Sequence, residues 1–193
     1  MTVAVVPFRR RGWLDSRALA MAASLGVLGF AVGAGLTSLR TPAGSPDVAQ
    51  HLVSDFARAE IAGQPFDVAS SDRHTVKPWL AGKIAGATTV VDLKGDGFPL
   101  VGGRIDVVGG TPVPTLVYQR REHQLALSEM PGSSANSSTA PRPSTRGGYN
   151  LVEWEEGGRF YAAVSDLPPA ELDAFAAAFR RAAAAEREEA PKP

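Results

Sequence analysis

The sequence predicts an α+β protein in which one apolar helix near the amino terminus precedes an antiparallel meander sheet, flanked by an amino-terminal and a carboxy-terminal helix. Three observations support this prediction. Residues 18–39 are apolar and uncharged, short β-prone segments between glycine-containing turns follow, and helical apolar spacing occurs on both sides of those segments. The 193 residues fit one domain with additional segments, since domains commonly have about 150 residues.

The apolar run at residues 18–39 predicts a transmembrane helix. Its 22 residues would extend roughly 33 Å, which is enough to cross a bilayer core. Four arginines lie among residues 9–17 and only Arg40 follows the run closely, and such an excess is typical of the cytoplasmic side. We therefore expect an inner-membrane protein with a short basic cytoplasmic segment at residues 1–17 and a carboxy-terminal domain outside the membrane, in the periplasm or its equivalent.

Two features of this run leave alternatives open. A cleaved signal peptide has the same basic start, but its apolar part is normally about 7–15 residues, which favours a permanent anchor. Gly29 and Gly33 have the spacing of a GxxxG motif. That motif lets two membrane helices self-associate, although glycine is also common in membrane helices that stay apart.

The first helix of the exported domain is expected at residues 47–61, after a breaker-rich linker at residues 40–46. Val48, Leu52 and Phe56 repeat every four residues and form one apolar stripe. We expect this stripe to cover a sheet.

The sheet is predicted from β-prone segments that are separated by turns. The expected strands are residues 88–93, 104–108, 113–119, 124–130, 149–154 and 159–164. Phe160, Ala162 and Val164 alternate along the last of them, so they should share one face. Leu172 and Phe175 belong to a second apolar stripe, which predicts a helix over residues 169–185.

The exported α+β domain therefore spans residues 47–185, with two segments that we expect to be irregular. Residues 131–148 are rich in serine, proline and glycine and lack a large apolar side chain, which predicts a disordered insertion. Residues 186–193 are charged and proline-containing, which predicts a frayed tail.

Composition excludes several classes of function. Twenty Lys and Arg residues balance twenty Asp and Glu residues, so we expect no nucleic-acid partner. The absence of cysteine excludes disulfides, thiolate zinc sites, iron–sulfur clusters and a cysteine nucleophile. The glycine-rich stretch lies inside the apolar run and not between a strand and a helix, so we expect no cofactor. No nucleophile stands beside a base at a recognisable spacing, so we expect no enzyme.

Histidine is the remaining candidate for metal binding. His74 and His123 could hold copper or zinc together with Asp72 or Asp106, since imidazole and carboxylate groups suit those ions. No HxH or HxxxH spacing places two histidines together, which favours structural roles for both. We therefore expect no metal site.

Several ordered motifs resemble the exported domain of bacterial transmembrane anti-sigma factors. They are DVASSDRHTVKPW at residues 67–79, GFPLVGGRID at 97–106, LVYQRREH at 116–123, GYNLVEW at 148–154, and AVSDL at 163–167 followed by AEL at 170–172. In that family a cytoplasmic helical domain, often with a His-x3-Cys-x2-Cys zinc motif, holds a sigma factor away from RNA polymerase. A single membrane helix connects it to a sensing domain outside.

The resemblance implies a regulator whose exported domain senses an envelope signal or partner and influences sigma-factor-dependent transcription. We expect the zinc-binding anti-sigma domain to be absent from this chain, because residues 1–17 are too short for the helices that would wrap a sigma factor and the sequence contains no cysteine. Three explanations stay open: a sensor half alone, a start upstream of Met1, or a separate anti-sigma subunit. The alternative function is an envelope metal-binding or scaffold protein without a transcriptional role.

The resemblance also suggests which residues form a sensing surface. These are His74, Lys77, Trp79, Arg104, Asp106, Tyr118, His123, Tyr149, Asn150 and Trp154. Structural roles are an alternative for the same set, because tryptophans anchor cores and Arg104 with Asp106 suits a same-face charge pair.

Overall fold

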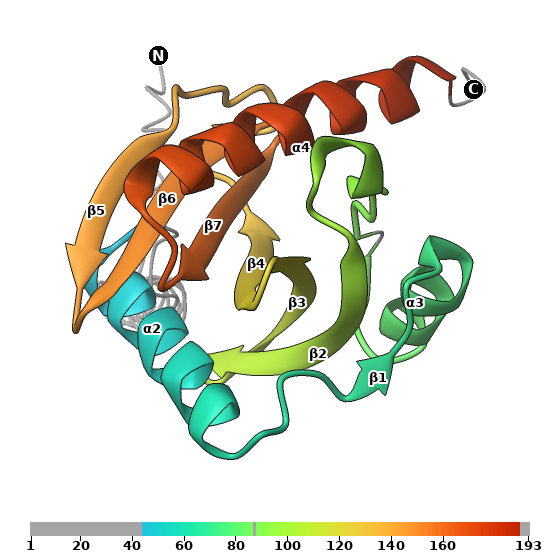
Figure 1. Ribbon diagram of the computed structural model, residues 1–193. Coiled ribbons are helices and arrows are strands. Elements are labelled where there is room, and N and C mark those ends of the chain that lie inside the picture. Colours follow the sequence, from blue (N-terminus) through green and yellow to red (C-terminus); the bar gives the residue numbers. More distant parts are fainter. Residues whose placement is uncertain (1–43, 87, 190–193) are drawn as a thin grey trace, which may run out of the picture. The chain divides into compact units, whose positions relative to one another are not determined.

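The computed structural model describes residues 44–189 apart from residue 87, and these form one unit with the sheet at its centre (Figure 1). The predicted transmembrane helix at residues 18–39, with Gly29 and Gly33, lies outside the described residues. In the part that is described, no helix combines the length and apolar character needed to cross a membrane. The elements are α2 (Pro46–Ile61), β1 (Val68–Ala69), α3 (Arg73–Ala81), the 3-10 turn η1 (Lys94–Asp96), β2 (Leu100–Val108), β3 (Thr111–Arg120), β4 (His123–Pro131), β5 (Arg142–Arg146), β6 (Tyr149–Glu156), β7 (Arg159–Ser165) and α4 (Pro169–Glu189).

The predicted α+β class is confirmed by a seven-stranded antiparallel sheet with helices at both ends of the described chain. Its strand order is β1-β2-β3-β4-β7-β6-β5. The chain therefore meanders from β1 to β4, crosses to the far edge for β5, and returns through β6 to place β7 beside β4. This return makes β4 and β7, which are distant in sequence, neighbours at the centre of the sheet.

Helix α2 covers one face of the sheet. Ser45 caps its start by accepting a hydrogen bond from the Val48 N–H at 3.3 Å. Leu52 and Phe56 are buried against the β7 side chains that the sequence placed on one face, Phe160, Ala162 and Val164. The predicted stripe of this helix is therefore confirmed, and burial of its apolar side chains holds α2 to the sheet.

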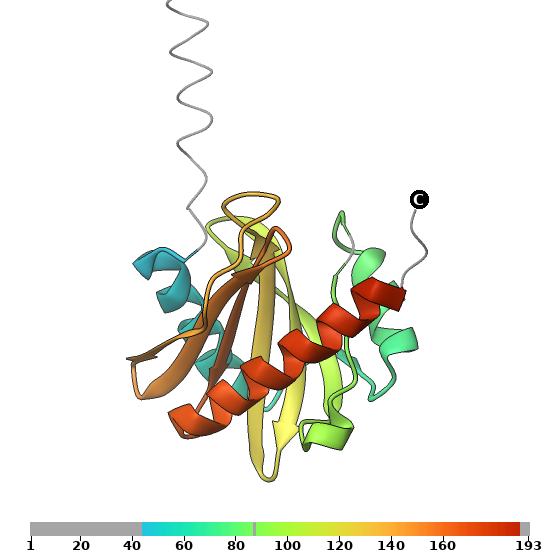
Figure 2. The ribbon, with the colours of Figure 1, turned by 90° about the horizontal axis from the view of Figure 1, so that it is seen from above.

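Helix α4 covers the opposite face, and Figure 2 shows it lying across the strands. Phe175 and Phe179 pack with Tyr118 of β3 and with Trp154 and Tyr161, whose rings stack at 5.3 Å between centroids. The helix continues to Glu189, so residues 186–189 of the predicted tail are helical, while residues 190–193 lie outside the described residues. Lys77 of α3 and Glu156 of β6 bind side chains of this last part, which gives it partners that the local sequence does not reveal.

Two segments differ from the sequence prediction: one that we expected to be disordered contains a strand, and one that we expected to be a strand is irregular. Residues 142–146, inside the expected disordered insertion at 131–148, form β5 and pair with β6. An edge strand needs only main-chain hydrogen bonds to one neighbour, so it can form without large apolar side chains. Conversely, residues 88–93 form no strand, and only Leu93 makes an isolated bridge, to Phe98.

Candidate functional site

The residues expected to form a sensing surface do not lie on one surface. Arg104, Asp106 and Tyr149 belong to the α2 side of the sheet, while Tyr118 and Trp154 are buried on the α4 side. The others lie at the margins: His74, Lys77 and Trp79 on α3, His123 at the β3–β4 turn, and Asn150 at the start of β6. The structure therefore divides the set into several local clusters, each with its own contacts.

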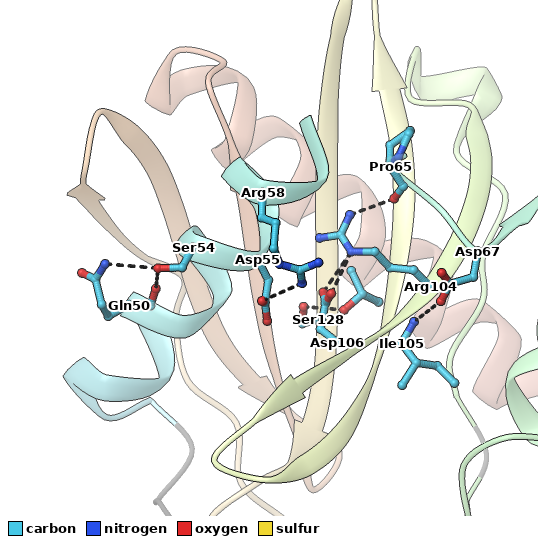
Figure 3. A network of polar contacts seen from close by, with 11 residues as sticks. Gln50, Ser54, Asp55, Arg58, Pro65, Asp67, Arg104, Ile105, Asp106 and Ser128 are labelled. Atoms are coloured by element: carbon cyan, nitrogen blue, oxygen red, sulfur yellow. Dashed lines mark hydrogen bonds and ion pairs between the residues drawn. The ribbon is translucent and has the colours of Figure 1, made fainter. Parts of the chain in front are cut away.

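Arg104 and Asp106 form a buried ion pair; they lie two residues apart on β2 and so point to the same face (Figure 3). The Arg104 Nε donates to both carboxylate oxygens of Asp106, at 2.9 and 3.1 Å. Its Nη1 donates to the Pro65 carbonyl at 2.8 Å, in the loop after α2. The predicted charge pair thus exists, and it fastens the end of the α2 segment to the sheet.

Further polar groups border this pair. Thr115 and Ser128 continue the cross-strand row from Arg104, and their hydroxyl oxygens lie 2.8 Å apart. Arg58 of α2 pairs with Asp55 at 2.9 Å; its pKa is raised by that hydrogen bond first and to a smaller extent by the charge of Asp106. No contact recorded among residues 44–189 joins either hydroxyl to a basic group that could activate it. The arrangement is that of a structural polar network.

The two histidines considered for a metal have separate surroundings. His74 lies in the first turn of α3, where its main-chain N–H donates to the Asp72 carboxylate at 2.8 Å. His123 Nδ1 lies 2.8 Å from the Asp166 carboxylate, in the loop before α4. The described residues contain no group of three or more His, Asp or Glu side chains placed to hold a metal ion.

A third cluster holds residues 88–93, which we call the strap. The strap runs along the α4 side of the sheet, and its side chains Val90, Val91 and Leu93 are buried in the core on that side. It is not part of a strand ladder, and two of its main-chain groups are bound by side chains of the sheet. The Tyr118 hydroxyl donates to the Val91 carbonyl at 3.0 Å, and the Thr89 N–H donates to Glu129 Oε2 at 2.8 Å.

Glu129 and Tyr161 complete this strap site, and the sequence analysis did not select either of them. They face each other across β4 and β7, and the Tyr161 hydroxyl lies 3.1 Å from the Thr89 hydroxyl. One signal for Glu129 was available: Leu125, Leu127 and Glu129 alternate along β4, so an acid stands on a buried face. A residue of this kind is unusual, because a buried carboxylate needs partners.

Burial dominates the electrostatics of the strap site. It raises the pKa of Glu129, against the opposing effects of the Thr89 N–H and the Arg159 charge. Arg159 Nε lies 3.4 Å from Glu129 Oε1, which is an ion-pair distance, but this oxygen has no partner with hydrogen-bond geometry. Burial and the neighbouring Glu129 raise the pKa of Tyr161 to about 12, and burial also raises the pKa of Tyr118. Both phenols therefore stay protonated and can donate hydrogen bonds at neutral pH.

Comparisons with protein-family models, with curated proteins and with solved structures find no match.

Proposed function

We propose that this chain is a membrane-anchored regulator similar to anti-sigma factors. Its domain outside the inner membrane senses an envelope signal or a partner, and it influences sigma-factor-dependent transcription through a sigma factor or an anti-sigma subunit. The proposal is supported by the uncharged run at residues 18–39, by the arginines that precede it, and by the ordered motifs between residues 67 and 172.

One observation carries the mechanism. Only residues 40–45 separate the predicted membrane helix from α2, and α2 is itself packed on the sheet through Leu52 and Phe56. A change in the domain that shifts α2 would therefore be passed to the chain that enters the membrane. A coupling free energy of about 1–3 kcal/mol is enough to alter a partner's binding several-fold or more.

The test uses the full chain with a carboxy-terminal tag, expressed in a bacterial host and extracted from washed membranes. We expect co-purification of an extracytoplasmic-function sigma factor or of its anti-sigma subunit. The matched variants are Val27→Arg with Leu28→Arg, which should abolish membrane insertion because each arginine costs about 2.5–3.5 kcal/mol there, and Val27→Leu with Leu28→Val, which should not.

Two results would overturn the proposal. One is recovery of the full-length wild-type chain in the soluble fraction. The other is the absence of both kinds of partner from the membrane extract. Tight, stoichiometric zinc or copper binding that is lost in His74→Ala and His123→Ala would favour the metal-binding alternative instead.

A further inference from the structure

The strap lies outside the strand ladders, and two buried side chains bind its main chain. Leu93, at the end of the strap, accepts main-chain hydrogen bonds from Asp96 and Phe98. Before it, the Thr89 N–H is bound by the Glu129 carboxylate and the Val91 carbonyl by the Tyr118 hydroxyl. Glu129 is 5 % exposed, and its carboxylate accepts a hydrogen bond from the Thr89 N–H. A segment that relies on so few side chains is a candidate for local opening, because few hydrogen bonds must break.

Charged groups approach Glu129 from several elements. On β7, Arg159 pairs with it and Tyr161 lies directly opposite. On α3, Lys77 contributes a weaker favourable charge, and this lysine is itself bound to Glu186 of α4 at 3.1 Å. On α4, the charge of Arg187 slightly opposes the rise in the pKa of Tyr161, and Arg187 also forms an ion pair with Glu156. These cations do not outweigh the desolvation of the carboxylate, since burial is the largest effect.

We infer that Glu129 and the strap form a proton-responsive latch, in which proton binding to Glu129 holds the strap closed on the sheet and loss of that proton favours opening. The inference concerns the exported domain alone and does not depend on the proposed transcriptional role. Opening would uncover Val90, Val91 and Leu93, which are buried in the closed state. It would therefore convert a change in the pH outside the membrane into exposure of an apolar surface.

The direction follows from linkage. In the closed state burial raises the pKa of Glu129 above its ordinary value, whereas in an open state water solvates the carboxylate and the pKa returns towards that value. The closed state therefore binds the proton more tightly, so its population rises as pH falls through the range between the two values. Each unit of difference between the two pKa values changes the opening equilibrium by about tenfold across that range.

Hydrogen exchange of the detergent-solubilised full chain, followed by mass spectrometry from pH 5 to 7.5 and corrected for intrinsic rates, tests this inference. Protection of residues 88–93 in the wild type should fall as pH rises. Glu129→Gln should keep the strap protected at all of these pH values, because the neutral amide still accepts the Thr89 N–H. Glu122→Gln, at an exposed position in the β3–β4 turn, should behave as the wild type.

A second variant keeps the test decisive if Glu129→Gln folds poorly. Arg159 favours the ionised carboxylate, so Arg159→Gln should move the fall in protection to higher pH. The latch is refuted if wild-type strap protection is independent of pH, if it increases with pH, or if Arg159→Gln leaves the profile in place. None of these outcomes depends on whether a sigma factor binds.

Discussion

Arg104 and Tyr118 show how single buried polar residues act in this molecule. Each reaches main chain that lies outside the strand ladders: Arg104 binds the Pro65 carbonyl and Tyr118 binds the Val91 carbonyl. A buried carbonyl without a partner costs about 1–3 kcal/mol, so these side chains stabilise irregular segments as well as the sheet. Both residues belong to the predicted sensing surface, and in the structure both bind main-chain carbonyls inside the domain.

The first prediction concerns the buried charge pair. Asp106→Ala should lower the free energy of unfolding by about 3–5 kcal/mol, because it leaves the buried Arg104 charge uncompensated. Urea unfolding of the solubilised full chain, followed by circular dichroism, measures the loss. Replacing both residues, Arg104→Met with Asp106→Leu, should recover much of it.

The control is the neighbouring ion pair between Arg58 and Asp55, in which the arginine is exposed. Arg58→Ala should cost less than about 1 kcal/mol, because the Arg58 side chain is 69 % exposed and water screens its interaction with Asp55. Equal losses in Asp106→Ala and Arg58→Ala would contradict the role assigned to the buried pair.

The second prediction concerns the strap's tyrosines. Tyr118→Phe should destabilise the protein by about 1–3 kcal/mol, because the Val91 carbonyl is left buried without its donor. Tyr161→Phe should cost less, since its partner is the hydroxyl of Thr89, which is partly exposed and can turn to water. Urea unfolding of both variants gives the comparison, and the reverse order would show that Tyr118 does not support the strap.

Among the elements, β1 and α4 are each positioned by specific contacts with a segment distant in the sequence. The start of α4 is held by Glu171, which accepts hydrogen bonds from Arg120 at 2.7 Å and Arg121 at 2.6 Å, and these bonds lower the pKa of Glu171. The short strand β1 lies so close to β2 that Gly102 has no room for a side chain. Glycine is required there by close approach rather than by an unusual backbone angle.

The third prediction follows from that approach. In Gly102→Ala the added Cβ would lie 2.5 Å from the Val68 carbonyl oxygen and 2.7 Å from the Phe66 ring, so β1 must move away from the sheet. We expect a loss of about 1–3 kcal/mol and faster hydrogen exchange in β1. Gly95→Ala, in η1, is the control, because no atom lies within 4 Å of the position its Cβ would take. Unchanged exchange in β1 for Gly102→Ala would show that the strand tolerates the added methyl group.

At the scale of the whole domain, one sheet is shared by two apolar cores. Side chains of β7 alternate between them, so that Phe160 packs under α2 and Tyr161 under α4. Both helices bury their apolar stripes against this shared sheet. The two cores should therefore fold and unfold together.

The fourth prediction tests this cooperativity. Phe56→Ala, on the α2 side, should lower stability by about 3–5 kcal/mol because it leaves a cavity in that core. Tryptophan fluorescence, which includes Trp154 on the α4 side, and far-ultraviolet circular dichroism should then give the same shifted midpoint. Separate midpoints for the two signals would mean that the faces unfold independently. Phe66→Leu, at a partly exposed position, should shift both signals only slightly.

Sequence periodicity was sufficient for most regular elements of the domain. The stripes at 47–61 and 169–185 correspond to α2 and α4, and the segments at 104–119 and 149–164 correspond to the paired strands β2–β3 and β6–β7. Periodicity works there because it records which side chains of a continuous segment are buried, and that is a local property. The transmembrane run and the regulatory role stay predictions from sequence.

Only tertiary structure decided the helix α3, the strand β5 and the composition of the strap site. Helix α3 is short and contains Pro78, which is unfavourable inside a helix, and packing of Val76 and Leu80 on the core stabilises it. Residues 88–93 are β-prone but meet the α4 face of the sheet instead of a free edge. Glu129 lies opposite Tyr161 because β7 pairs with β4, and it also binds Thr89 of the strap. Contacts of this kind join segments that are far apart in the sequence, so local sequence patterns do not reveal them.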